Sequence, residues 1–328
     1  MAAIKVEGLT KDFSGFKAVD NMSLSIKEGE VFGLLGPNGA GKTTTISMLS
    51  TLLKPTSGKA IVNGYNVVDS SDDVRKSIGI VFQDPSLDDE LTAYENLDFH
   101  GRLYHIPKDV REKKAHKLLK LVELEDKKDH LVKTYSGGMK RRLEIARGLL
   151  HEPKVLFLDE PTLGLDPQTR NHLWTYIKKL NKDKKITIIL TTHYMDEADS
   201  LCKKIAIIDH GKIIVSDTPK KLKESIGGDV VTIRSKKSKE IYDAISAPWI
   251  KHKEKRNGRV TFNLEDAEKH VAEIVAVCAR KGIEIESLSI HEPTLEDVFL
   301  HYTGRQIREE EASPKAHMRM RHRAWSRR

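Results

Sequence analysis

The sequence contains little cysteine and no long apolar run. Its two cysteines, Cys202 and Cys278, match no metal-ligand spacing, which excludes a cysteine-bound metal and predicts two buried or inert thiols in a reducing compartment. No apolar stretch approaches the roughly 18 to 20 residues that span a bilayer. The first residues, MAAIKVEGLT, lack a basic region followed by an apolar core and are not typical of a secretory signal. We therefore expect a cytoplasmic protein.

The net charge of +8 is concentrated at the C-terminal end. Residues 305–328 contain eight Lys or Arg and three Glu, a net +5, which leaves +3 for residues 1–304. A body so close to neutral does not favour a nucleic-acid partner. The basic tail KAHMRMRHRAWSRR is suited either to an anionic membrane surface or to a solvated, disordered end, and the second is the simpler interpretation.

The pattern of apolar residues predicts an α/β protein. Short alternating stretches from Ile4 to Ile26 indicate antiparallel strands, and VFGLL and VLFLDE are continuous apolar runs typical of buried strands. ITIILTTH predicts a further strand. A helical pattern covers about residues 91–147, and LDPQTRNHLWTYIKKL predicts a further helix with Asp166 at its N-cap. Strands that alternate with helices imply a mostly parallel sheet covered on both faces.

The chain is long enough for one large core and a smaller second one. Gly227-Gly228 is a plausible linker, and residues 229–303 predict strand, helix, strand, helix, strand, helix. We expect a main domain at 1–226, a small α+β domain at 227–304 and a basic tail at 305–328.

A glycine-rich loop follows the first buried strand and fits the phosphate-binding pattern G-x-x-x-x-G-K-[ST]. Its glycines let backbone N–H groups converge on phosphate oxygens, and the following helix adds the partial positive charge of its N-terminus. A lysine there reaches the β- and γ-phosphates, and the next threonine ligates Mg²⁺. An ordinary glycine turn would not need this position between strand and helix. The residues expected to bind ATP here are Gly36, Pro37, Asn38, Gly39, Ala40, Gly41, Lys42, Thr43 and Thr44.

Two adjacent carboxylates, Asp159 and Glu160, end the strand VLFLDE. Neighbouring strand residues point to opposite sides, so the two can serve different purposes. One is suited to hold Mg²⁺ and the other to act as general base on an attacking water. Gln83, His193 and Phe13 are weak candidates taken alone, because a glutamine or histidine at a strand end is usually solvated and a phenylalanine near a turn is usually core.

The order of these elements is more specific than any one of them. An aromatic residue, GPNGAGKTT, a glutamine after an apolar strand, YSGGM, VLFLDEP, GLD and TTH occur in sequence, and IIDHGKII follows. The chain thereby resembles the nucleotide-binding subunit of an ATP-binding-cassette (ABC) transporter over about residues 4–220. Tyr135, Met139 and the segment EPTLEDVFLHYTG resemble the daunorubicin-resistance-type drug exporters, which implies a drug- or lipid-type exporter without fixing the transported molecule.

The resemblance assigns a role to each matched position. It implies an ATPase core with an antiparallel β subdomain and a helical signature subdomain, whose ligands are ATP and Mg²⁺. Phe13 becomes the adenine-stacking aromatic, with Phe16 a poorer candidate, and the signature faces the ATP of a second subunit. The remaining implied roles are Glu160, His193 and Gln83 in catalysis; Thr43, Gln83 and Asp159 at Mg²⁺; Ser136, Gly137 and Gly138 in the signature; and Asp166 in the D-loop.

Two functions from different classes fit this pattern. The favoured one is the ATPase subunit of an exporter, bound to a transmembrane permease at the cytoplasmic face and paired with a second ATP-binding subunit, most simply its own copy. The alternative is an ABC ATPase that acts on nucleic acid or the ribosome. Only a helical-domain length separates Lys42 from Ser136, and the chain holds one phosphate loop, so neither a long coiled coil nor a second cassette is present.

Overall fold

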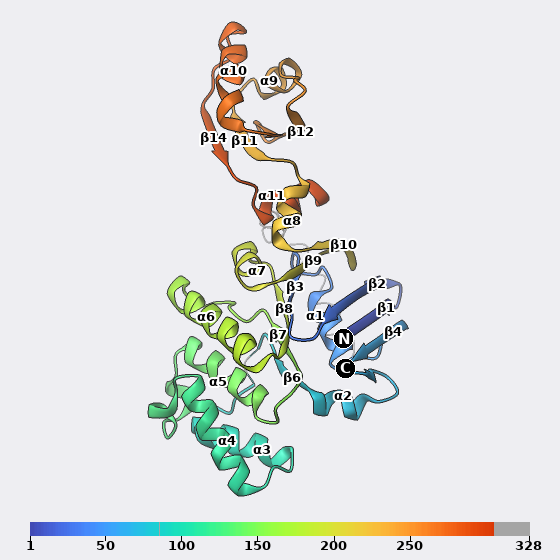
Figure 1. Cartoon of the computed structure of the whole chain (residues 1–328), viewed down its shortest axis with the longest axis vertical. Coiled ribbons are helices and arrows are strands. Elements are labelled where there is room, and N and C mark those ends of the chain that lie inside the picture. Colours follow the sequence, from blue (N-terminus) through green and yellow to red (C-terminus); the bar gives the residue numbers. More distant parts are fainter. Residues whose placement is uncertain (85, 305–328) are drawn as a thin grey trace. The chain divides into compact units, whose positions relative to one another are not determined.

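The computed structural model describes residues 1–84 and 86–304, so the basic tail at 305–328 and its expected membrane contact lie outside the described residues. The chain divides into two compact units, the first at Met1–Ser216 and the second beginning at Asp217 (Figure 1). No helix in the described part is long and apolar enough to cross a bilayer. Both cysteines are buried and unpaired, as the sequence predicted.

A six-stranded sheet in the order β10-β9-β3-β8-β7-β6 forms the centre of the first unit. Strands β9, β3, β8, β7 and β6 run parallel. Every residue of β3, β7 and β8 is buried, which explains why their sequences are continuous apolar runs. The strands are β3 Val31–Leu35, β6 Ile78–Val81, β7 Val155–Asp159, β8 Thr187–Thr192, β9 Lys204–Asp209 and β10 Lys212–Asp217.

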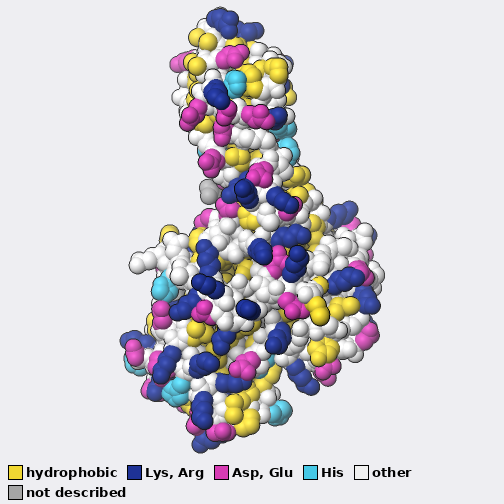
Figure 2. Space-filling view, viewed as in Figure 1, with side chains coloured by type: hydrophobic (Ala, Val, Ile, Leu, Met, Phe, Trp, Pro, Cys, Tyr) yellow, Lys and Arg dark blue, Asp and Glu magenta, His cyan; other side chains and the backbone are white. Residues whose placement is uncertain are grey.

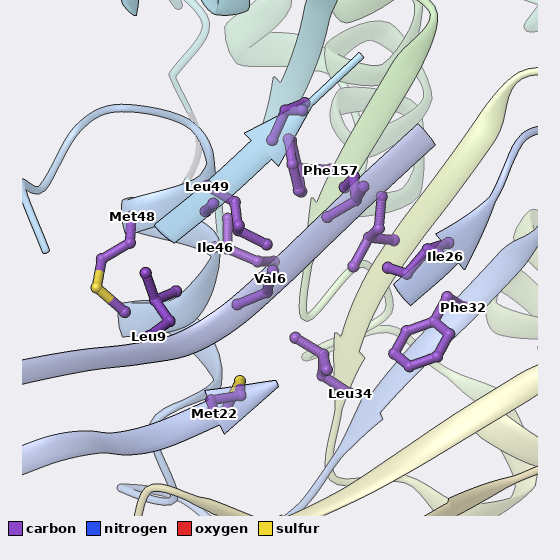
Figure 3. Packing of buried hydrophobic residues seen from close by; sticks show 14 of the residues in the cluster. Val6, Leu9, Met22, Ile26, Phe32, Leu34, Ile46, Met48, Leu49 and Phe157 are labelled. Carbon is purple, nitrogen blue, oxygen red and sulfur yellow. The ribbon is translucent and has the colours of Figure 1, made fainter. Parts of the chain in front are cut away.

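A second, antiparallel sheet in the order β2-β1-β4-β5 packs on the same core. Its strands are β1 Ala2–Phe13, β2 Phe16–Lys27, β4 Ser57–Val62 and β5 Tyr65–Asn66. Helix α1, Lys42–Leu49, lies between the two sheets and contacts β2, β4 and β7. Figure 3 shows side chains from β1, β2, β3, α1 and β7 meeting in one apolar cluster. This cluster fixes the start of α1, and with it the phosphate loop, against the central sheet.

The expected helical stretch resolves into three packed helices. These are α3 Ala93–Leu103, α4 Lys108–Leu121 and α5 Gly137–Leu149. Two short 3-10 helices, η1 Glu125–Lys127 and η2 Val132–Thr134, lie between α4 and α5. A capping box of Thr92 and Glu95 begins α3. The other helices of the unit are α2 Ser71–Ser77, α6 Pro167–Lys184 and α7 Met195–Leu201, and Asp166 caps α6 as expected.

The second unit contains one strand more than the sequence analysis expected. Asn257 and Gly258, at φ 46° and 76°, turn the chain between β12 and β13, because both central positions of a type I′ hairpin need positive φ. The sheet order β12-β13-β11-β14 and the sequence βαββαβ give a ferredoxin-like topology. Its elements are α8 Pro219–Ser225, β11 Asp229–Arg234, α9 Ser238–Ala244, β12 Ile250–Arg256, β13 Arg259–Leu264, α10 Ala267–Arg280, β14 Ser287–His291 and α11 Leu295–Thr303.

Helix α8 packs against α11 within the second unit. The boundary between the two compact units therefore lies before α8, whereas the boundary expected from the sequence follows that helix at Gly227-Gly228. A separate core under α9 and α10, with Phe262 and Ile233 fully buried, stabilises this unit.

Candidate functional site

The carboxyl ends of three neighbouring parallel strands bring the predicted motifs together. In the sheet, Leu35 of β3 pairs with Thr192 of β8, and Thr191 of β8 pairs with Asp159 of β7. The phosphate loop follows β3, His193 follows β8 and Glu160 follows β7. The amide of Glu160 donates to Thr191 O at 3.2 Å, which extends the ladder by one residue beyond β7. Segments far apart in the sequence therefore meet at the carboxyl ends of the parallel strands.

The phosphate loop requires glycine for two physical reasons. Gly41 has φ 102°, a conformation that L side chains rarely adopt. A Cβ at Gly36 would lie 2.2 Å from Ile208 O, and one at Gly41 would lie 2.4 Å from Ala18 O, so the loop backbone is packed directly against other backbone. No side chain caps α1 at Gly41, and this helix N-terminus is suited to an anion.

Lys42 is the buried cation of the site, with 5% of its surface exposed. Its Nζ donates to the carbonyls of Gly36 at 2.7 Å and Pro37 at 3.1 Å, and it forms an ion pair with Glu160 Oε1 at 3.1 Å. The loop thus curls around its own lysine. The ammonium group lies where it can meet phosphate and the carboxylate of Glu160 together.

Asp159 lies beside two hydroxyl groups. Thr43 Oγ1 donates to Asp159 Oδ1 at 3.2 Å, and Thr191 Oγ1 donates to the same oxygen. Burial raises the pKa of Asp159 above its ordinary value, and these two hydrogen bonds only partly offset that effect. A buried carboxylate with an adjacent hydroxyl is a donor set of hard oxygens, which suits Mg²⁺ in a site completed by phosphate and water. The residues at this position therefore fit the metal expected from the sequence.

Glu160 is held by two basic side chains. His193 Nδ1 donates to Glu160 Oε2 at 2.6 Å, and Lys42 contacts the other carboxylate oxygen. Burial would raise the pKa of Glu160, but the hydrogen bond from His193 and the positive charges beside it together lower the pKa. Its φ of 49° is unusual for a residue other than glycine and marks a backbone held by its surroundings. The carboxylate is therefore ionised and fixed in position.

The signature residues begin helix α5. Ser136 is its N-cap and accepts from the amide of Met139 at 3.3 Å. Ser136, Gly138 and Met139 line a hollow of about 430 Å³ together with residues of α6, and no phosphate-loop residue lines it. A Cβ at Gly138 would lie 2.3 Å from Thr169 Cγ2. Glycine is therefore required at 138 by contact within the chain.

Asp166 also acts within its own chain as the N-cap of α6. It accepts from the amide of Thr169 at 3.0 Å and from its hydroxyl at 2.6 Å. These bonds hold Thr169 in the orientation that contacts Gly138. The D-loop aspartate and the signature glycine are therefore linked through one threonine.

Three expected residues are not brought into contact with this cluster. Gln83 is exposed just after β6 and makes no side-chain hydrogen bond among the described residues. Phe13, 38% exposed at the end of β1, lies under Lys11 Nζ at 5.1 Å from the ring centroid. Phe16, 52% exposed, begins β2. The roles given to them in nucleotide and Mg²⁺ binding stay predictions.

Sequence reasoning missed two residues that shape the site. Thr191 was one more β-branched residue in an apolar strand, yet its hydroxyl binds Asp159 and accepts from the amide of Glu160 at 3.0 Å. Arg141 belonged to an apparently basic helix, yet it is buried behind the acidic pair. Neither has a signal in a single sequence. A larger cavity of about 820 Å³ lies at the opposite ends of β7 and β8, around Lys154 and Thr187, and contains none of the motif residues.

Comparison with known proteins identifies similar chains. The model of a family described as "ABC transporter" matches residues 19–163, and one described as "ATP-binding protein DrrA1-3-like, C-terminal domain" matches residues 218–303. The daunorubicin/doxorubicin resistance ATP-binding protein DrrA of Streptomyces peucetius is 41% identical, over 92% of this chain and 92% of its own. The linearmycin resistance ATP-binding protein LnrL of Bacillus subtilis is 38% identical, over 93% and 100%. The Nod factor export ATP-binding protein I of Cupriavidus metallidurans is 37% identical, over 94% and 99%.

Solved structures show the same likeness for the first unit. The structure of cbiO1 from Clostridium perfringens, part of the ABC transporter complex cbiONQ, is 35% identical with a TM-score of 0.64, and the match covers 69% of this chain and 93% of that one. A dimeric, post-hydrolysis structure of the ATP-binding cassette MJ0796 bound to ADP and Pi is 31% identical with a TM-score of 0.59, over 66% and 98%.

Proposed function

Since this chain belongs to the ATP-binding subunits of ABC transporters and is an ATPase that works with a transmembrane permease, we propose that it drives an exporter of drug-type or lipid-type molecules. The observation that carries the site assignment is the cluster of Lys42, Asp159, Glu160 and His193 at the ends of β3, β7 and β8. Export is supported by the relatives, which are named for drug resistance and Nod factor export and match nearly the whole chain.

ATP would be held by the phosphate loop and the first turn of α1. Backbone N–H groups between Asn38 and Thr44 and the Lys42 ammonium supply positive potential for the phosphates. Thr43 and Asp159 would hold Mg²⁺, which neutralises phosphate charge when bound. Gln83 and Phe13 would complete the metal shell and the adenine contact.

Glu160 is the residue we assign as general base. In hydrolysis, the oxygen of a water molecule attacks the γ-phosphorus, the bond from phosphorus to the bridging oxygen breaks, and the water proton passes to the base. The lowered pKa of Glu160 keeps the carboxylate unprotonated before the step. The hydrogen bond from His193 orients it, and Lys42, which contacts its other oxygen, would bind the phosphates. The step therefore relies on placement more than on base strength.

A second copy of the chain would complete each site. The hollow lined by Ser136 and Gly138 contains no phosphate-loop residue, so the signature presents a surface of its own. The dimeric cassette MJ0796 shows that a similar fold associates in pairs. We infer a homodimer in which the signature of one copy faces the ATP of the other, on the cytoplasmic face of the membrane.

The alternative, an ATPase acting on nucleic acid, has less support. On the face shown in Figure 2, Lys and Arg side chains are interspersed with Asp and Glu and do not form a continuous basic stripe. Among the described residues of the first unit, no feature requires a polynucleotide partner.

Co-expression with a candidate permease from the same gene neighbourhood tests the proposal. The pair should co-purify and lower the accumulation of a hydrophobic drug in cells, and the Glu160→Gln protein should co-purify without lowering it. Stimulation of ATP hydrolysis by RNA or ribosomes, with none by a permease, would favour the alternative instead.

A further inference from the structure

One face of helix α5 carries three buried or half-buried charged residues, Arg141, Glu144 and Arg147. They lie three residues apart, a spacing that places side chains on the same side of a helix. All three contact backbone groups of other segments. Two of these segments carry residues of the nucleotide motifs described above, one with Asp159 and Glu160 and the other with Gln83.

Arg141 uses its whole guanidinium group. It is 7% exposed, and its Nε donates to Pro161 O at 2.9 Å. One terminal nitrogen donates to Asp159 O at 2.8 Å and Glu160 O at 3.2 Å, and the other donates to Phe82 O and to Glu144 Oε2. These contacts match the five N–H donors of an arginine. A single side chain thus holds three consecutive carbonyls at the end of β7.

Glu144 and Arg147 extend the contacts to the segment that follows β6. Glu144 Oε1 accepts from the amide of Ser86 at 2.8 Å, and Arg147 donates to the carbonyl and hydroxyl of the same serine. Arg141 meanwhile holds the carbonyl of Phe82. Phe82, directly before Gln83, and Ser86, three residues after it, are therefore both attached to α5, while Gln83 itself is exposed.

We propose that Arg141 is a positioning residue for hydrolysis, and that the face formed by Arg141, Glu144 and Arg147 couples the Gln83 segment to Glu160. The peptide at Glu160 has φ 49° and depends on its surroundings for that conformation. Arg141 holds the carbonyls on both sides of this residue, whereas Thr191 holds its amide. A shift of the Gln83 segment moves the carbonyl of Phe82, to which Arg141 donates. The guanidinium group then moves as well, and with it the backbone around Glu160 that orients the Glu160 carboxylate. This inference rests on the proposed role of Glu160.

The test compares purified full-length Arg141→Met, Arg141→Lys and Arg111→Met with wild type. Methionine keeps most of the length of arginine and removes every donor, while lysine keeps the charge and some donors. Arg111 of α4 is the matched control, because it is also 7% exposed and binds a carboxylate, Asp98 of α3, and a carbonyl, that of Ile106 between α3 and α4. Each variant is measured for ATP affinity, kcat, KM and thermal midpoint.

We expect Arg141→Met to lower kcat by about 10- to 100-fold, the range that a small misplacement of a reacting group produces, with ATP affinity and KM little changed. Arg141→Lys should recover part of kcat. Arg111→Met should lower the thermal midpoint at least as much but leave kcat within about twofold. In a Glu160→Gln background, Arg141→Met should add almost nothing, because residues that act as one unit are not additive.

Three results would overturn the inference. They are a normal kcat for Arg141→Met, an equal loss of kcat in Arg111→Met at equal thermal midpoint, or a full additional loss of rate in the Glu160→Gln background. If Arg141→Met is too unstable to purify, Glu144→Gln with hydrogen exchange at the Ser86 amide replaces it, and unchanged kcat and exchange would count against the proposal. Near-normal hydrolysis by Glu160→Gln alone would instead refute the assigned base, so the two failures are distinguishable.

Discussion

A methyl group at Gly138 would lie 2.3 Å from Cγ2 of Thr169, closer than real side chains approach. Thr169 cannot turn away easily, because its hydroxyl is bound to Asp166 at 2.6 Å. The glycine at the start of α5 is thus fixed by the packing of α5 on α6. Any substitution at Gly138 therefore disturbs the packing of α5 on α6 as well as any contact with a nucleotide.

Gly137 separates the two effects. A Cβ at Gly137 would meet only Leu165 Cδ2 at 3.6 Å, an ordinary contact. We expect Gly138→Ala to lower the free energy of unfolding by about 1–3 kcal/mol through overpacking. Gly137→Ala should cost less than half as much. Urea unfolding of both variants checks this, and equal losses would show that the Thr169 contact relaxes freely.

Gly137→Asp gives a cleaner test of the signature acting on the partner's ATP. The added negative charge should leave ATP binding to the isolated chain unchanged and abolish ATP-dependent pairing. Mixing it with Lys42→Ala should restore heterodimers, because one composite site then pairs an intact phosphate loop with an intact signature. Crosslinking with and without ATP measures this. Loss of ATP binding by isolated Gly137→Asp would show that the signature acts within its own chain.

Lys42→Ala should weaken ATP binding by about 1.5–3 kcal/mol, because it removes a charge-assisted contact to phosphate. The variant also leaves Glu160 without one of its two basic partners. Titration calorimetry measures the affinity, with exposed Lys5→Ala as control. Equal ATP affinities for Lys42→Ala and wild type would rule out this role for the lysine.

Asp159→Asn should separate stability from activity. Because burial raises the pKa of Asp159 above 3.8, its ionised form costs folding free energy at neutral pH. Asparagine keeps an oxygen for Thr43 and Thr191 without the charge, so we expect the variant to be as stable as wild type or more so. Any advantage should shrink as pH falls through the raised pKa of Asp159, where the wild-type carboxyl becomes neutral.

The pKa of Glu160 is shifted in the opposite direction. It is lowered below 4.5, so the stability it contributes is present above that pH and is lost only as pH falls through the lowered value. Above about pH 5 Glu160 therefore stays ionised, and the pH dependence in that range reports on Asp159. Urea unfolding between about pH 5 and about pH 8 provides the measurement, and Mg²⁺-dependent hydrolysis should be lost. A variant clearly less stable than wild type at neutral pH would contradict this interpretation.

The sequence was sufficient where one short segment determines the structure. The apolar runs ending at Leu35 and Asp159 predicted buried strands, and Gly41 followed by Lys42 predicted a loop opening a helix, because these features depend on local pattern. The extra strand in the second unit also had a local signal, Asn257-Gly258, which the sequence analysis did not use.

Other features depend on segments that meet only in the folded chain. The need for glycine at 138 comes from Thr169, and the burial of Arg141 comes from the carbonyls of β7 and of the residue after β6. Neither partner lies near the other in the sequence. The local pattern at Arg141, a run of basic residues on a helix, even favoured a solvent-exposed surface.

The most direct test of the account is the rate of ATP hydrolysis by Glu160→Gln. The amide cannot accept the proton of the attacking water, yet it keeps the size of the side chain and its place between Lys42 and His193. We predict a loss of hydrolysis of about 100-fold or more with ATP binding retained, and an ATP-bound dimer visible by size exclusion. Hydrolysis near the wild-type rate would contradict the central claim that Glu160 is the base of this site.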